Sequence, residues 1–250
     1  MNIRYFFNLG LKNPRGFAEA MLRQPMITGK LSDKQVLKLL YRLRFKRFPN
    51  FEKPETFNEK LCWLILNNRN PLYNLMVDKY EAKQYVNNVL TQSGCLYDCI
   101  IPTYGIYEKF EDIDFVTLPD QFVIKTTHDS GCVTVVIDKS QLDIDSLKTK
   151  INKSLQYNYY WFSREWVYKD VQPRIIIEKL LVAGDKSGDL KDYKVFCFNG
   201  QPEYVKVDYD RFSDHHANYY DFSWNLQDWG EVICPPVYDR ELPPPQLTCI

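Results

Sequence analysis

Residues 121–136, QFVIKTTHDSGCVTVV, hold the residue types with the clearest chemical potential in this chain. An apolar segment carries one lysine, Lys125, and a short polar turn over 128–131 leads into a second β-branched segment. The lysine supplies a positive point charge, and backbone N–H groups of a small-residue turn can approach phosphate oxygens. The pattern therefore suits a nucleotide polyphosphate, although it is not a Walker motif and an ordinary β-hairpin also fits it.

The sequence patterns that could bind a metal ion are less specific than this phosphate-binding pattern. Asp-x-Asp triplets, which occur in metal-dependent glycosyltransferases, stand at 112–114, 143–145 and 208–210, but such triplets are frequent by chance. Seven cysteines form no C-x-x-C pair and only three histidines are present, so we expect no structural zinc site. Unpaired cysteines in this number are typical of reduced thiols in the cytoplasm.

The spacing of apolar residues predicts which elements position these groups. Helices are expected over 33–45, from the N-cap Thr56 onward, from about residue 77, and over 145–157. Strands are expected at 100–101, 121–127, 132–137, 174–182, 193–198 and 203–207. Thr56 with Glu59 forms a capping-box pattern, and Asn199-Gly200 is a strong hairpin signal. The order predicts an α+β fold with a mostly antiparallel sheet.

The overall charge and hydropathy exclude several classes of protein. The chain has 32 basic and 32 acidic residues, which argues against a polybasic nucleic-acid binder. We find no secretory signal and no apolar stretch long enough to span a membrane. The aromatic residues at 5–7, with Ile3, Arg4 and Lys12 nearby, would suit a peripheral membrane contact, although docking of these residues on the protein body is the favoured interpretation.

Several segments together resemble a known family. They are PETFNEKLCWLILNNRNPLY, DKYEAKQYV, IPTYGIYEKFEDIDFVTLPDQFVIKTTHDSG, NYYWFSREWVYKDVQPRIIIEKLL, GDLKDYKVFCFNGQPEYVKVDYDRFSDH and YYDFSWNL. The chain resembles, over about residues 37–229, the TupA-like (teichuronopeptide) branch of the ATP-grasp superfamily. Members of this branch are often described as polysaccharide-biosynthesis proteins or glycosyltransferases.

The resemblance implies an ATP-grasp-like fold, with a helical N-terminal region followed by a mostly antiparallel sheet lobe that is incomplete at the C-terminus. It divides the chain into four parts. They are an N-terminal helical extension (1–50), a first α/β lobe (51–118), a nucleotide-binding lobe (119–229) and a Pro-rich tail (230–250).

The resemblance also implies which residues bind ATP. Lys125 would contact the α- and β-phosphates, and Lys79 would face the phosphates from the first lobe. Glu178 would lie at the hinge near adenine or ribose, and Lys194 would point into the same cleft. The loop residues His128, Ser130 and Gly131 would fold over the phosphates. Lys79 and Lys83 fit the solvated face of a helix equally well.

The substrate side of the site would be formed by Asp208, Asp210 and Arg211. Arg211 would be the catalytic residue, since a guanidinium can bind a substrate carboxylate through two parallel hydrogen bonds. A loop salt bridge between Asp210 and Arg211 is the simpler alternative. The pair His215-His216 is more typical of a surface than of a catalytic base.

The family also implies Mg²⁺, bound by acidic residues on further strands. Residues 230–250 offer only Glu231, Asp239 and Glu241, set among prolines. We therefore assign no metal ligand, and we expect the chain to be C-terminally truncated and impaired in the chemical step.

The leading hypothesis is a bacterial, cytoplasmic ATP-dependent ligase of capsule or surface-polysaccharide biosynthesis. It would join the carboxylate of a uronic-acid-containing sugar or glycan to an amino acid or amine, with no nucleic-acid partner. A glycosyltransferase and a non-catalytic nucleotide-binding remnant remain as alternatives.

Overall fold

The computed structural model describes residues 13–94, 99–182, 190–210, 214–231 and 233–239. The chain divides into two compact units, residues 1–180 and 181–250. The boundary falls inside the range predicted as a nucleotide-binding lobe, and the four-part division stays a prediction.

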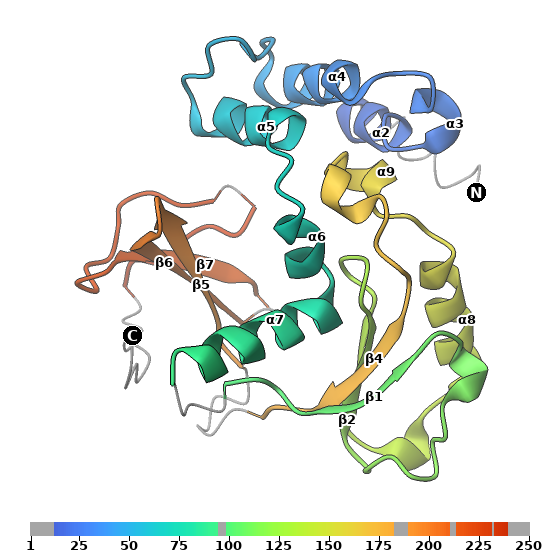
Figure 1. Ribbon diagram of the computed structural model, residues 1–250. Helices are drawn as coiled ribbons and strands as arrows, with labels where there is room; N and C mark the ends of the chain where they lie inside the picture. The colour runs from blue at the N-terminus through green and yellow to red at the C-terminus, as the bar shows by residue number, and fades with distance from the viewer. Residues whose placement is uncertain (1–12, 95–98, 183–189, 211–213, 232, 240–250) are drawn as a thin grey trace. The chain divides into compact units, whose positions relative to one another are not determined.

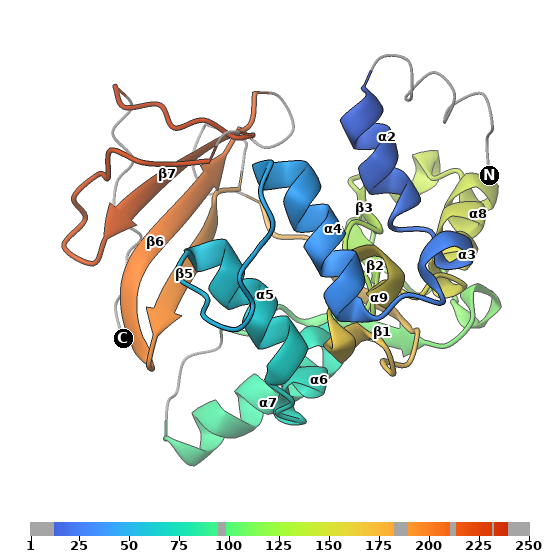
Figure 2. The same ribbon diagram turned by 90° about the horizontal axis from the view of Figure 1, so that it is seen from above.

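The first unit begins with helices. They are α2 (Pro14–Met21), α3 (Pro25–Thr28), α4 (Asp33–Phe45), α5 (Phe57–Asn67), α6 (Leu72–Val77) and α7 (Lys79–Gln92). The helix predicted over 33–45 is confirmed at both ends, and it begins with a capping box between Ser32 and Gln35. The predicted capping box of Thr56 and Glu59 is also present, so Glu59 accepts hydrogen bonds at the start of α5. Seen from above, α2, α4 and α5 lie beside one another (Figure 2).

A four-stranded sheet follows, with strand order β1-β4-β2-β3 and only antiparallel pairs. Its strands are β1 (Thr103–Tyr107), β2 (Phe122–Thr126), β3 (Val133–Val136) and β4 (Ile175–Lys179). The strand predicted at 100–101 was wrong, because the strand begins after Pro102 rather than ending before it. The carbonyl of Pro102 still accepts a hydrogen bond from the N–H of Lys179, so pairing continues to the proline but needs no donor from it.

The two faces of this sheet differ in chemistry. One face buries Phe122, Ile124, Ile175 and Ile177 in a core that also contains Leu147 and Ile151 of α8 (Ile144–Leu155). Lys125, Ile176 and Glu178 alternate with these residues and therefore point to the opposite face, where α7 lies (Figure 1). Short helical elements complete this unit: η1 (Phe110–Asp112), η2 (Lys139–Gln141), α9 (Tyr160–Ser163) and η3 (Trp166–Tyr168).

A buried arginine ties α9 to the N-terminal helices. Arg164, which has a left-handed backbone (φ 59°) and is 2% exposed, donates to the carbonyl of Thr28 (3.2 Å) and to Asp33 (3.4 Å). The hydroxyl of Tyr160 donates to the same carboxylate at 2.6 Å. Because Arg164 and Tyr160 are buried and bonded to these partners, they fix α9 against α3 and α4.

The second unit is a three-stranded antiparallel sheet of β5 (Asp192–Phe198), β6 (Gln201–Tyr209) and β7 (His216–Asp221). Asn199 (φ 51°) and Gly200 (φ 79°) both have left-handed backbones, so the predicted two-residue hairpin turn is confirmed. The sequence analysis missed β7, whose side chains Ala217, Asn218, Tyr219 and Tyr220 are all buried. The α+β fold class predicted from the sequence is confirmed.

Candidate functional site

Three charged side chains meet on the α7 side of the first sheet. Glu178 of β4 is 2% exposed, and its two carboxylate oxygens form ion pairs with Lys125 of β2 and Lys83 of α7. Val123 stands directly opposite Glu178 in the register, so Lys125 lies two residues further along the same face. Lys83 also donates to the carbonyl of Ile101 (2.6 Å). The carboxylate thus sits between two ammonium groups, one of which has other protein partners.

Lys79, one helical turn before Lys83, binds the turn that follows β2. Its Nζ donates to the carbonyls of Thr126 (2.7 Å) and Asp129, and its backbone N–H donates to the carbonyl of Thr127 (3.2 Å). Burial lowers the pKa of Lys79, and nearby Lys125 lowers it further, while Asp129 opposes the change. Lys79 therefore holds the turn closed at one end of α7.

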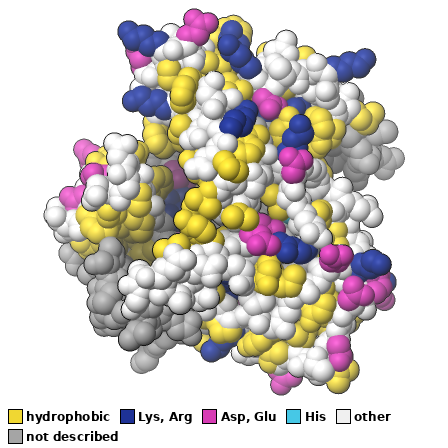
Figure 3. Space-filling model, viewed as in Figure 1, with side chains coloured by type: hydrophobic (Ala, Val, Ile, Leu, Met, Phe, Trp, Pro, Cys, Tyr) yellow, Lys and Arg dark blue, Asp and Glu magenta, His cyan; other side chains and the backbone are white. Residues whose placement is uncertain are grey.

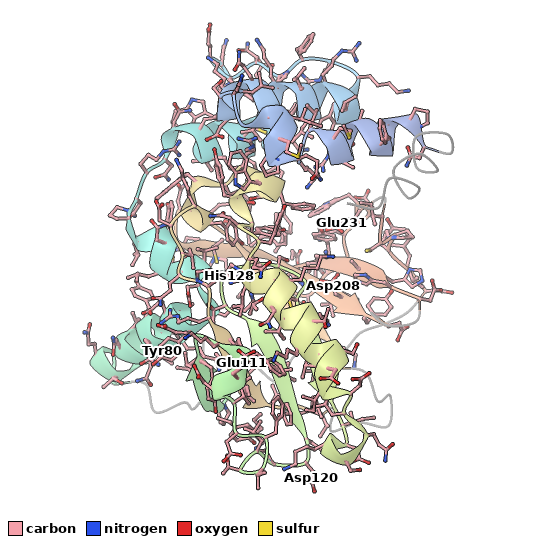
Figure 4. The ribbon with its side chains drawn as sticks, turned by 90° about the vertical axis from the view of Figure 1, so that its right-hand side faces the viewer. Tyr80, Glu111, Asp120, His128, Asp208 and Glu231 are labelled. Atoms are coloured by element: carbon pink, nitrogen blue, oxygen red, sulfur yellow. The ribbon has the colours of Figure 1, made fainter. Side chains whose placement is uncertain are left out.

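Side chains of the turn itself point inward. The Asp129 carboxylate accepts from Thr126 Oγ1 (2.6 Å) and from Ser154 of α8. Nε2 of His128 faces the carbonyls of Ser154 (3.1 Å) and Tyr157 (3.2 Å), so this nitrogen carries the proton and donates to them. His128 is 2% exposed, and Figure 4 labels it beside the end of α8. These hydrogen bonds fix the turn to the C-terminal end of α8 and to the residues that follow it.

The backbone of the turn presents unsatisfied donors. No N–H of residues 128–131 donates to an acceptor in the described part of the chain. Ser130 and Gly131 are exposed, and Gly131 has φ +103°, a conformation that only glycine adopts easily. Successive free N–H groups in a tight turn form a concave site for an anion.

The start of α7 is joined to this turn by a buried carboxylate. Asp78, the N-cap of α7, is 2% exposed and accepts from the backbone N–H groups of Tyr80 (2.8 Å) and Glu81 (3.1 Å). Its second oxygen accepts from Thr127 Oγ1 (3.1 Å) and from Arg174 (3.0 Å). Lys79 and the turn are therefore positioned by one rigid group of bonds.

A second charged cluster lies within the second unit. Asp208 of β6, labelled in Figure 4, is 2% exposed and accepts from Lys194 (2.7 Å) and from Nε2 of His215 (2.8 Å), with Lys206 at 3.2 Å. Burial alone would raise the pKa of Asp208, but these three partners outweigh burial and lower it to about 2. Asp208 is therefore ionised at neutral pH.

The cluster extends to the segment after β7. Lys206 pairs with Glu231 at 2.7 Å, and the hydroxyl of Tyr219 donates to the same oxygen at 2.7 Å. Nδ1 of His215 lies 3.2 Å from the thiol of Cys234. The prediction that His215 belongs to a surface pair therefore misses its hydrogen bond to Asp208, which a sequence pattern gives no means of finding.

The predicted site residues divide between the two units. The structure brings Lys79, Lys125 and the turn that includes His128, Ser130 and Gly131 together with Glu178 in the first unit. Lys194 and Asp208 contact each other in the second. Asp210 has a left-handed backbone (φ 52°), and Arg211 lies outside the described residues.

Sequence reasoning missed Lys83, Asp78 and Arg174 as members of the site. The spacing of Lys79 and Lys83 at i and i+4 was the available signal, because it places both on one side of a helix. The pairing of Arg174 with Asp78 joins residues 96 positions apart, and no local pattern encodes it.

In the described part of the chain, no three His, Cys, Asp or Glu side chains are grouped so that they could hold a metal ion. The Asp-x-Asp triplets have local roles instead. Asp143 caps α8 by accepting from the N–H of Ser146 (3.0 Å), and Asp208 is bonded to the cations described above.

Comparison with protein families gives one match. The model of the TupA-like ATP-grasp family matches residues 59–247. The chain belongs to the TupA-like ATP-grasp family. As a member, it is an ATP-grasp ligase-like protein, and the match covers both units described above.

The resemblance was expected over about residues 37–229. The match to the TupA-like family model starts later, at residue 59, and extends further, to residue 247 in the Pro-rich tail. Neither the curated proteins nor the solved structures that we compared with this ATP-grasp chain gave a match. Among the described residues, no helix has both the length and the apolar character that crossing a membrane requires.

Proposed function

We propose that this chain binds ATP with the turn 128–131 and Lys125 and uses it to activate a carboxylate for amide formation. The observation that carries the proposal is the row of free backbone N–H groups in this turn, next to a lysine on β2. The family match supports ATP as the anion that this site receives.

Lys125 is the residue that changes partner in this proposal. In the structure it pairs with Glu178, and a phosphate oxygen of ATP would compete for the same ammonium group. Glu178 keeps its ion pair with Lys83 when Lys125 turns to the phosphate. Lys79 acts as a positioning residue, because its bonds go to carbonyls of the turn.

The chemistry has two steps. A carboxylate oxygen of the substrate attacks the γ-phosphorus of ATP, and the bond to the bridging oxygen breaks to give an acyl phosphate and ADP. An amine then attacks the acyl carbon, loses a proton and displaces inorganic phosphate, which leaves an amide. The protein contributes position and positive charge to the first step.

In the second unit, the candidates for binding the substrate are Lys194 and, by the family resemblance, Asp210 and Arg211. Lys194 is half-exposed, whereas Asp208 beneath it is saturated by its partners, so Lys194 is the group of this pair that can reach a ligand. We assign Arg211 to the substrate carboxylate, with Asp210 beside it, on the strength of the family resemblance.

The substrates that fit such an ATP-dependent ligase are a uronic-acid-containing sugar or glycan and an amino acid or amine. Such a reaction belongs to capsule or surface-polysaccharide biosynthesis in a bacterial cytoplasm. This assignment rests on the family resemblance.

Calorimetry tests the nucleotide assignment directly. We expect ATP to bind at least about tenfold more tightly than UDP-glucose or UDP-glucuronic acid, because the turn offers several N–H donors to a triphosphate. The reverse order would favour the glycosyltransferase alternative. A separate assay measures ADP release with and without glucuronic acid and an amino acid. Release that requires both compounds would support the ligase reaction, whereas a rate that neither compound changes would contradict it.

A further inference from the structure

A cavity of about 330 Å³ lies among the N-terminal helices and α9, all within the first unit. It is separate from the nucleotide site. Apolar side chains from α4, α5 and α9 form most of its wall: Leu37, Leu40, Phe45, Leu61, Ile65 and Phe162. Arg23, Arg44 and Glu165 are the charged residues of its lining.

Arg23 is a partly buried cation that lacks an acidic partner. Its guanidinium stacks 3.8 Å from the centre of the Phe162 ring and donates to the Phe162 carbonyl at 3.0 Å. No carboxylate of the described chain lies within ion-pair distance of it. Burial lowers the pKa of Arg23 and the positive charge of Arg44 lowers it further, whereas the negative charge of Glu19 opposes the change. An unpaired, partly buried cation beside a second cation is stabilised by an anion.

Neither of the nearby carboxylates, Glu19 and Glu165, forms an ion pair with Arg23. Arg44 pairs with Glu19 at 3.3 Å, and Glu19 is shared with Arg15 at 3.5 Å. Glu165 forms no ion pair with Arg23 or Arg44 among the described residues, and burial raises the pKa of its carboxyl group. The cavity is thus apolar within and positive at Arg23 and Arg44, which fits a ligand with an acidic head and an apolar tail.

The surrounding helices carry a strong positive excess. Residues 13–70 contain 12 Lys and Arg but 5 Asp and Glu, whereas the whole chain has 32 of each. Lys34, Lys38 and Arg42 are exposed at four-residue spacing along α4 and so form one ridge. In Figure 3, dark blue and yellow side chains lie together over the helices at the top of the view.

Large apolar side chains are exposed in the same region. Met26 is 92% exposed, Phe48 57% and Phe57 51%, and the guanidinium of Arg42 lies 5.8 Å from the Phe48 ring. A positive surface alone would suit any polyanion. Exposed methionine and phenylalanine among the cations favour a membrane interface over a nucleic acid, because they gain by leaving water.

We propose that this cavity binds an anionic phospholipid of a membrane surface, with Arg23 and Arg44 on the lipid phosphate and the start of an acyl chain against the apolar wall. The positive ridge of α4 and the exposed apolar residues would face the same membrane. This site is independent of ATP and lies outside the proposed ligase chemistry.

Vesicle binding tests the proposal with the full chain. We expect co-sedimentation with phosphatidylcholine vesicles that contain phosphatidylglycerol, and at least about tenfold weaker binding to phosphatidylcholine alone. Arg23→Gln should weaken binding to the anionic vesicles roughly fivefold, whereas Arg23→Lys, which keeps the charge, should retain most of it. Arg15→Gln is the matched control, because Arg15 is an arginine of the same helical region that pairs with Glu19, as Arg44 does, but does not line the cavity.

The apolar wall has its own pair of variants. Leu61→Ser should weaken vesicle binding, whereas Leu75→Ser should not, since both leucines are similarly exposed and Leu61 alone of the two lines the cavity. Equal losses for Arg15→Gln and Arg23→Gln would overturn the cavity site in favour of general surface charge. Equal affinity for soluble glycerol phosphate, or tighter binding to single-stranded DNA than to the vesicles, would overturn the lipid assignment.

Discussion

Lys125 and Glu178 are in contact across neighbouring antiparallel strands of the first sheet, with the carboxylate buried and the ammonium partly exposed. A buried carboxylate needs a cation, and Lys83 supplies a second one to its other oxygen. Lys125 can therefore leave Glu178 for a phosphate without leaving a buried charge unpaired.

Lys125→Met should lower ATP affinity at least about tenfold, because a charge-assisted bond to the phosphates is lost. Isothermal titration calorimetry measures it. Lys148→Met is the control, since Lys148 forms an exposed pair with Glu111 on the other side of the sheet and should leave ATP affinity unchanged. Unaltered ATP binding by the Lys125 variant would remove this lysine from the nucleotide site.

Glu178→Gln should reduce the free energy of unfolding by about 3 kcal/mol, because Lys83 and Lys125 lose their shared buried anion. Urea denaturation followed by tryptophan fluorescence gives this value. The exposed counterpart Glu111→Gln should change stability by less than about 0.5 kcal/mol. Adding Lys83→Met to Glu178→Gln should recover part of the lost free energy of unfolding, because one unpaired ammonium group is removed. A further decrease would show that the unpaired charge of Lys83 is not the cause of the loss.

Gly131→Ala should weaken ATP binding, because φ +103° is strained for alanine and the turn must shift its N–H groups to relieve the strain. A Cβ at this position meets no atom within 4 Å, so any effect comes from the backbone and not from a clash. Gly94→Ala is a matched control with φ +69° and equally open surroundings, at the end of α7. Both variants should lose roughly 1 kcal/mol of stability, but only Gly131→Ala should lose nucleotide affinity.

The stability of the second unit should depend on pH through Asp208. Its pKa is lowered from 3.8 to about 2 on folding, so its stabilising contribution is present above pH 3.8 and is lost as the pH falls through about 2. The full contribution is about 2 kcal/mol. Asp208→Asn should therefore cost most stability near pH 5 and progressively less towards pH 3, as measured by urea unfolding at each pH. A cost that is independent of pH would mean that the carboxylate charge does not stabilise this unit.

Several elements follow from short stretches of sequence alone. The helix over 33–45, the capping box of Thr56 with Glu59 and the turn at Asn199-Gly200 were all predicted and are present. Each depends on residues within about four positions of one another, through helix periodicity, a reciprocal cap or a left-handed backbone. The family resemblance added Lys125 and Glu178 as members of one site.

Only the tertiary structure decided what these residues touch. Lys83, Lys125 and Glu178 meet because β4 pairs with β2 in one particular register and α7 crosses the same face, contacts that span up to 95 residues. Likewise β7 was missed because its place beside β6 and its buried side chains, not a local pattern, make it a strand. Interactions within a helical turn or a hairpin are encoded by neighbouring residues, whereas ion pairs between strands depend on register and burial, which only the packed chain determines.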